Sequence, residues 1–165
     1  MLLSTEHRRF LWVGQSLVPF AINLVLNGVI GWAMFRGTKA IPLWGASSIG
    51  GDVLGMSFFL PAITCLIVTP LVRSQVRKGA APALRGTLAG WLRPFQQPLG
   101  LRACALGLAC VALAGGLAIA LLSALGVETL RFAPFLGWKA LYAGVLAALV
   151  TPVIALLALA DPAGR

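Results

Sequence analysis

The chain has 165 residues, of which 59% are hydrophobic and only 10% are charged, and its mean hydropathy is +0.95. A soluble domain is roughly 45–50% apolar with about 25% charged residues, and a chain this short cannot bury such an excess in one core. These values exclude a soluble domain, a coiled coil, a disordered tail and a secreted disulfide scaffold, and they predict an integral membrane protein.

Four apolar stretches are long enough to cross a bilayer, which takes about 20 residues of helix. We predict spans at about residues 10–35, 53–72, 103–125 and 139–160, within a single membrane domain that covers residues 1–165. No Asp, Glu, Lys, Arg or His lies well inside these limits. Because an exposed backbone is not tolerated in lipid, the predicted fold class is an all-α bundle of four transmembrane helices.

The first span carries a polar stripe. Ser16, Pro19, Asn23, Asn27 and Gly31 recur every three or four residues and therefore share one helix face. An asparagine that faced lipid would leave its amide unpaired, so this face must meet other helices or water. Two interpretations follow: interhelical hydrogen bonds that lock the bundle, or the polar wall of a permeation path or ligand pocket.

Two further groups of residues extend the second interpretation. Thr64 and Thr69 in the second span are candidates for the same wall, and Thr69 precedes Pro70, where the helix is expected to kink or to end as an ion-binding half-helix. Asp52 follows two glycines just before this span. It is suited to cap the helix, or to bind a cation at the mouth of a path.

The loop at 73–102 is the longest polar segment. Residues 82–93 are bounded by prolines and predict a short amphipathic helix at the membrane surface. Arg85, Trp91 and Arg93 are its candidate docking residues, for a partner or for anionic lipid headgroups. The alternative is a linker without a binding role.

Lysine and arginine are distributed unevenly between the two sides of the predicted bundle. Nine lie in the N-terminal segment, the 73–102 loop and the tail, against four in the other two loops. The positive-inside rule therefore predicts that both termini are cytoplasmic. The net charge of +9 is explained by this topology and does not indicate nucleic acid.

Two short sequence motifs occur in both halves of the chain. Lys39–Gly45 and Arg131–Gly137 share the pattern cation-x-x-Pro-apolar-apolar-Gly, and Val68–Pro70 is repeated as Val150–Pro152. These matches are consistent with a parallel 2+2 repeat, although two short matches can also arise by chance in so biased a composition.

One run resembles a known group of proteins. It extends from Ile41 to Arg73 and contains Pro42-Leu-Trp-Gly45, Ser48-Ile49, Asp52 and Leu60-Pro-Ala-Ile-Thr-Cys-Leu-Ile-Val-Thr-Pro-Leu-Val-Arg73, with a further match around Lys139 and Val150-Thr-Pro152. This run is similar to small uncharacterised bacterial four-helix inner-membrane proteins. The resemblance implies the topology and a bacterial inner-membrane location, and it carries no activity.

Catalytic groups are scarce. His7 is the single histidine, and Cys65, Cys104 and Cys110 lie inside apolar runs without a CxxC pair. No metal-ligand spacing, phosphate loop or hydrolase triad is visible, and no span holds a carboxylate for proton coupling. We therefore predict no enzyme activity, no cofactor and no metal site.

Two functional hypotheses remain. The first is a non-enzymatic accessory, assembly or scaffold subunit of a larger membrane complex, with membrane lipids and a membrane-protein partner or a second copy as its partners. The alternative is a small homo-oligomeric channel or transporter for an ion or neutral solute, which would use the polar stripe of the first helix.

Overall fold

The computed structural model describes residues 10–81 and 90–161. Within these ranges, four helices are long and apolar enough to cross a membrane, at Trp12–Phe35, Ile49–Arg77, Leu99–Ala124 and Phe132–Leu159. The predicted class, an α-helical multi-pass membrane protein, is confirmed. The predicted side of each terminus is a separate matter and stays a prediction.

The elements follow one another along the chain with short connections. The first span joins a π-helical segment η1 (Phe10–Leu17) to α2 (Val18–Phe35), and the second is α3 (Ile49–Arg77). The third joins α4 (Leu99–Cys110), the π-helical segment η3 (Val111–Gly115) and α5 (Gly116–Ala124), and the fourth is α6 (Phe132–Leu159). The short 3₁₀ segment η2 (Gly90–Phe95) precedes α4.

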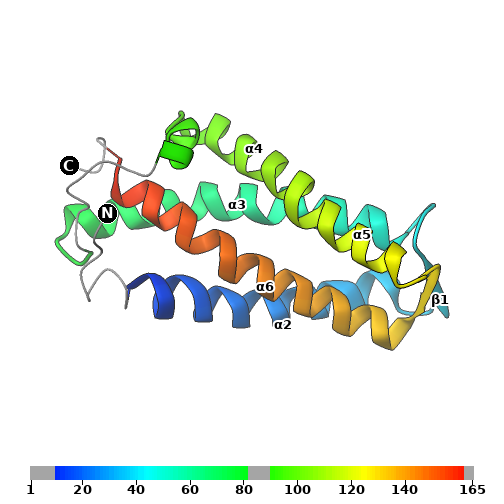
Figure 1. Cartoon of the computed structure of the whole chain (residues 1–165). Coiled ribbons are helices and arrows are strands. Elements are labelled where there is room, and N and C mark those ends of the chain that lie inside the picture. The colour runs from blue at the N-terminus through cyan, green and yellow to red at the C-terminus, as the bar shows by residue number, and fades with distance from the viewer. Residues whose placement is uncertain (1–9, 82–89, 162–165) are drawn as a thin grey trace.

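The helices form a row in which α6 packs against both α2 and α3, and α3 packs against α4. In Figure 1, α2 lies at one edge of this row and the α4–α5 helix at the other. Helix α2 is the least covered: only 6% of its apolar window is buried, against 44% for α6. An edge helix with so little cover is exposed to lipid or to another protein on most of its surface.

The third span meets α3 through glycines. A Cβ atom at Gly107 would lie 2.8 Å from the Phe58 ring, and one at Gly115 would lie 2.9 Å from Ser57 Oγ. Only glycine lets the two backbones approach this closely, so these two positions fix a tight contact between the third span and α3.

Strand β1 (Ala40–Pro42) pairs antiparallel with β2 (Thr129–Arg131), in the register Ile41 to Leu130. The two strands close the end of the bundle that we call the β end. We call the other end, where α2 begins and α6 finishes, the terminal end (Figure 1). In the two predicted loop motifs, Pro42 lies in β1 whereas Pro134 lies in α6, so the motifs adopt different structures and the repeat stays a prediction.

The helices extend past the predicted span limits and contain charged residues that we had placed in loops. Arg73 lies inside α3, Arg102 inside α4 and Lys139 inside α6. Arg102 and Lys139 are almost fully buried, at 1% and 3% exposed. The predicted limits ended at charges because an unpaired charge is costly in lipid, but each of these charges has a carboxylate partner.

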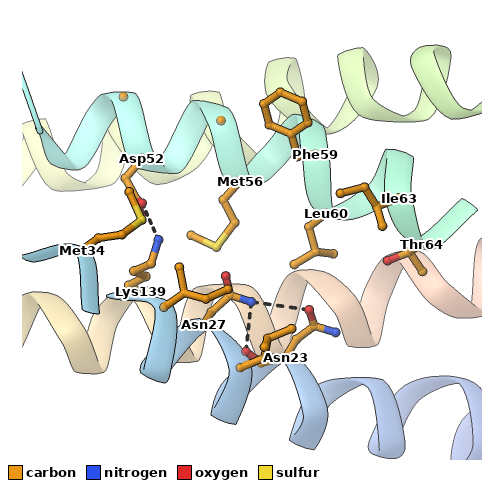
Figure 2. A pocket seen from close by; sticks show the side chains of 14 residues that line it. Asn23, Asn27, Met34, Asp52, Met56, Phe59, Leu60, Ile63, Thr64 and Lys139 are labelled. Atoms are coloured by element: carbon orange, nitrogen blue, oxygen red, sulfur yellow. Dashed lines mark hydrogen bonds and ion pairs between the residues drawn. The ribbon is translucent and has the colours of Figure 1, made fainter. Parts of the chain in front are cut away.

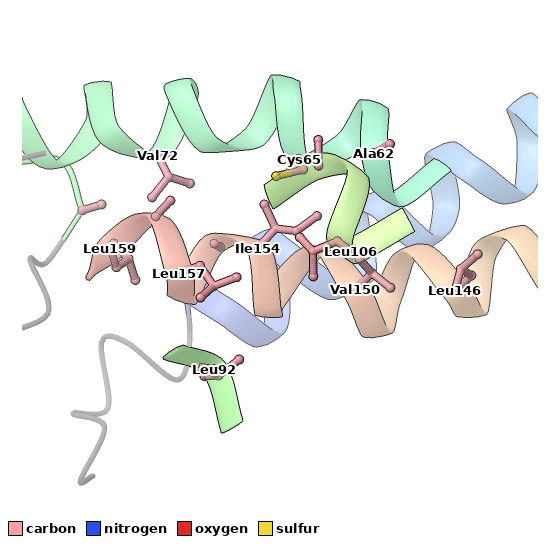
Figure 3. Close-up of a cluster of buried hydrophobic side chains, with 14 residues drawn as sticks. Ala62, Cys65, Val72, Leu92, Leu106, Leu146, Val150, Ile154, Leu157 and Leu159 are labelled. Carbon is pink, nitrogen blue, oxygen red and sulfur yellow. The ribbon is translucent and has the colours of Figure 1, made fainter. Parts of the chain in front are cut away.

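A cluster of buried apolar side chains fills the terminal half of the bundle. Cys65 and Val72 from α3 meet Ile154 and Leu157 from α6, and Leu92 from η2 is 1% exposed at its edge (Figure 3). The 73–102 segment is thus attached to the bundle through Leu92. Helix η2 also continues through Pro94, which we had expected to end a helix.

Most of the predicted interfacial helix at 82–93 lies outside the described residues, including Arg85. Trp91 and Arg93 fall on η2, but their side chains are outside the described part of the structure. The docking role of these three residues stays a prediction.

Candidate functional site

The main candidate site is a groove between α2 and α3, with α6 contributing its base. Its cavity has a volume of about 490 Å³. Four of the five predicted path residues line it, namely Asn23, Asn27, Thr64 and Asp52, and Figure 2 shows them with Lys139. The groove runs from Asp52 in the first turn of α3 to Thr64, about midway along that helix. The remaining lining side chains are mostly apolar: Leu26, Ile30, Met34, Met56, Phe59, Leu60 and Ile63.

The rim of the groove is open. Leu26, Met34, Phe59 and Ile63 each expose more than half of their surface. Since α2 and α3 both pack on α6 and make little contact with each other, no helix of this chain covers the groove along its length. A polar base with an apolar open rim at membrane depth has to be covered by lipid, water or another protein.

An ion pair forms the β end of the groove. Lys139 Nζ of α6 donates to Asp52 Oδ1 of α3, and both side chains are nearly buried. Gly31 of α2 makes this reach possible, because a Cβ there would lie 2.8 Å from Lys139 Cδ. The pair holds α3 and α6 together beside α2.

Asp52 does not cap α3. The N-cap is Ser48, whose Oγ accepts a hydrogen bond from the Gly51 amide at 3.2 Å, and Asp52 follows in the first turn. Its carboxylate still complements the positive end of the helix dipole. Because Ser48 caps the helix, Asp52 is left to pair with Lys139.

Asp52 keeps one oxygen unpaired. Its Oδ2 atom is buried and accepts no hydrogen bond from any described residue. A buried acceptor without a donor costs about 1–3 kcal/mol, and more if it is charged. The groove therefore holds spare hydrogen-bonding capacity at the Asp52 end.

The asparagines bond within their own helix. Asn23 Nδ2 donates to the Pro19 carbonyl at 3.0 Å, and Asn27 Nδ2 donates to the Asn23 carbonyl at 3.1 Å. Among the described residues, neither amide bonds to another helix. The first interpretation of the stripe, an interhelical lock within the chain, is thus not what these two side chains do, and their half-buried amides face the groove.

Two glycines on α3 line the groove, although the sequence analysis did not single them out. Gly51 and Gly55 are four residues apart and so lie on one face of α3. A Cβ at Gly55 would meet nothing within 4 Å, and one at Gly51 would meet only Ser48 Oγ. Small residues at this spacing typically let a second helix approach closely, but no helix of this chain does so here.

A smaller cavity of about 270 Å³ continues from the groove toward the β end. It shares Met34, Gly51 and Asp52 with the groove and is also lined by Ser47 and Ser48. Asp52 therefore lines both cavities. Its role as the mouth of a path stays a prediction.

Thr69 lies apart from the groove. It is fully buried, and its Oγ1 lies 3.6 Å from Cys65 Sγ on the same helix. Its counterpart Thr151 is also fully buried, and its Oγ1 has no partner among the described residues. Both threonines are thus core positions, whereas Pro70 is exposed and Pro152 is half-buried. None of these four residues lines the groove.

A second charged cluster at the terminal end was missed. Asp161 accepts two hydrogen bonds from Arg102, both at 2.8 Å, and two from Arg73, at 2.7 and 3.1 Å. Burial raises the pKa of Asp161, but the bonds and charges of Arg102 and Arg73 outweigh it, so the pKa lies below its usual value. The only signal in the sequence was that Asp161, one of four acids, directly follows an apolar span.

The polar side chains of the groove can hold a ligand by hydrogen bonds. In residues 10–81 and 90–161, no three His, Cys, Asp or Glu side chains gather to hold a metal ion. The polar groups that line the groove are one ion pair, two amides and a hydroxyl. These side chains can hold a polar group by hydrogen bonds, and they disfavour an apolar group at the base of the groove.

These features define the class of the molecule: a multi-pass helical membrane protein with a polar groove on one side. The chain matches no family model, no curated protein and no solved structure in the comparisons made.

Proposed function

We propose that this chain is a non-enzymatic accessory or assembly subunit, which acts by docking a transmembrane helix of another protein in the α2–α3 groove. The observation that carries the proposal is the uncovered pair Gly51 and Gly55 beside the unpaired Asp52 Oδ2. A docked helix would contact the glycines closely and supply a donor to the carboxylate.

The alternative occupants suit the groove less well. Lipid tails can cover the apolar rim, but they offer no donor to Asp52 or partner to the two amides. Water can fill the mouth near Ser47 and Ser48, yet it gains nothing from the exposed rim. A helix with one polar side chain among apolar ones satisfies both parts of the groove.

The proposal includes the predicted setting. The protein would lie in the bacterial inner membrane with both termini in the cytoplasm. Arg77 and Lys78, exposed at the terminal end, would then face anionic headgroups, which attract basic side chains near the membrane surface.

The experiment is gentle extraction from native membranes, followed by native mass measurement and identification of the associated proteins. The test variant is Gly55→Leu, which adds bulk to the groove from a position where a Cβ would meet nothing within 4 Å. The matched control is Gly137→Leu, an exposed α6 glycine with nothing within 4 Å of its Cβ position. We expect the wild type and the control to retain a stoichiometric partner and Gly55→Leu to lose it. If Gly55→Leu retains the same partner, the groove does not dock it.

A second candidate function is a path for a small solute, formed when oligomerisation closes the groove. It is favoured by the two neighbouring cavities, which share Met34, Gly51 and Asp52 as lining residues. Asn27→Leu separates the two functions. In a path, flux into proteoliposomes would be lost while the assembly persists; in a docking surface, the assembly itself weakens.

A further inference from the structure

The α2–α3 groove has two independent marks of a contact surface. Gly51 and Gly55 present a small-residue face that nothing in the described chain approaches, apart from the capping Ser48. On the same wall, Asp52 is about nine-tenths buried and has an unpaired oxygen. What remains is which helix lies there.

The polar stripe of α2 is self-complementary. Asn23 donates one of its two amide hydrogens to the Pro19 carbonyl, which leaves the other hydrogen free. Asn27 Oδ1 accepts no hydrogen bond within the described residues. Asn23 Oδ1 accepts only one long hydrogen bond, from Asn27 Nδ2 at 3.5 Å, and keeps a second lone pair. Asn23 therefore offers a free donor and a free acceptor at one depth, and it can bond to the same residue of a second copy.

Symmetry in a membrane brings like residues together. Two copies inserted in the same orientation are related by an axis along the membrane normal, so each residue lies at the same depth as its counterpart. The Asn23–Asn27 stripe of one copy then faces that of the other without any shift in register. Only 6% of the apolar window of the first span is buried, so a second copy can reach this face of α2.

We propose that the helix in the groove is α2 of a second copy of this chain. In the resulting two-fold dimer, α2 of each protomer lies between α2 and α3 of the other, against Gly51 and Gly55. The two asparagine stripes hydrogen-bond across the axis, and the exposed side chains Leu26 and Ile30 become buried. This inference rests on the proposed function, because it names the helix that docks.

Disulfide trapping in lipid bilayers tests the geometry. In a Cys104→Ser/Cys110→Ser background, Ile30→Cys should give a disulfide-linked dimer under mild oxidation, since both copies place this residue near the axis. Leu121→Cys is the matched control: it is similarly exposed, but it lies on α5 at the far edge of the row. A cross-link at 121 without one at 30 would overturn the proposal.

The asparagine stripe is tested by the dimer dissociation constant, measured by energy transfer between labelled copies. Asn27→Leu should raise this constant roughly tenfold, the effect of losing a pair of interhelical hydrogen bonds. Asn27→Gln, which keeps the donor and the acceptor, should stay within about threefold of wild type. Helicity and the unreactive, buried thiol of Cys65 report whether each variant remains folded.

The result separates this inference from the proposed function. Suppose that the purified protein is monomeric in bilayers, that it is extracted from native membranes with a different protein, and that Gly55→Leu releases this protein. The proposal of a second copy is then wrong, and the docking function stands. If the protein is monomeric in both settings, both proposals fall. A dimer that Asn27→Leu leaves unchanged also overturns the inference.

Discussion

Two buried ion clusters lie at opposite ends of this bundle, and they use their carboxylates differently. At the terminal end, both oxygens of Asp161 are satisfied by Arg102 and Arg73, and the cluster joins α3, α4 and the end of α6. At the β end, Asp52 binds only Lys139 and leaves one oxygen without a donor beside an open groove. The first cluster satisfies both carboxylate oxygens and acts as a structural lock, with the buried Arg102 Nε as its one group that has no partner among the described residues. The second cluster leaves a carboxylate oxygen unused.

We expect the largest loss of stability when the Asp161 cluster at the terminal end is broken. Asp161→Leu would leave Arg102 buried without a carboxylate, and removing one partner of a buried pair costs about 3–5 kcal/mol. The unfolding free energy in detergent micelles should fall by this amount. The double variant Asp161→Leu/Arg102→Leu should recover a large part of it, and a double variant as unstable as the single one would contradict the account.

A smaller loss is expected at the β end. Lys139→Met leaves Asp52 unpaired, but this carboxylate can contact water through the adjoining cavities, so we expect the unfolding free energy to fall by about 2 kcal/mol. Asp52→Asn combined with Lys139→Met should restore stability in a double-mutant cycle. If Lys139→Met lowers the unfolding free energy as much as Asp161→Leu does, the two clusters contribute equally to stability and the proposed difference between them is wrong.

The terminal lock should also depend on pH. The pKa of Asp161 is lowered in the folded state, so its contribution is complete above the unfolded pKa of about 3.9 and is lost as the pH falls through the lower folded value. Stability should be nearly constant from about pH 5 to 8 and decline below about pH 4. In Asp161→Asn the decline at acid pH should be shallower, and an unchanged slope would remove Asp161 as its cause.

The smallest effect on stability is predicted in the groove itself. A Cβ at Gly55 would meet nothing within 4 Å, so Gly55→Leu should change the unfolding free energy of the monomer by less than about 0.5 kcal/mol. Gly107→Leu, by contrast, would force α4 away from Phe58 and should cost about 1–3 kcal/mol. Thermal unfolding of both variants and the wild type measures these changes. Equal losses of unfolding free energy in the two variants would show that the groove is already packed.

The sequence predicted the spans well because composition alone determines which segments enter lipid. It failed at the helix ends, since each buried charge is paired with a residue far along the chain: Lys139 with Asp52, 87 positions away, and Arg102 with Asp161, 59 away. A single sequence shows that such charges exist but not that they meet.

At the candidate site, too, the sequence predicted local features but not the contacts between distant residues. Helical spacing placed Asn23 and Asn27 on one face, but it could not say which helix stood opposite. Thr64 and Thr69 were grouped although five residues rotate a helix by about 140° beyond a full turn, which moves Thr69 away from the groove. Gly51 was placed in a loop, because the helix was expected to begin at 53 and begins at Ile49. Gly55 lay inside the predicted span, but nothing in the sequence showed that its face was uncovered.

The central claim is that another protein helix lies in the α2–α3 groove, and site-specific photo-crosslinking in native membranes tests it most directly. A photoreactive residue at Ile63, on the exposed rim, is compared with one at Leu121, similarly exposed on α5. We predict a discrete protein adduct from position 63, whether to this chain or to another, and only lipid adducts from position 121. Lipid adducts alone at both positions would contradict the account.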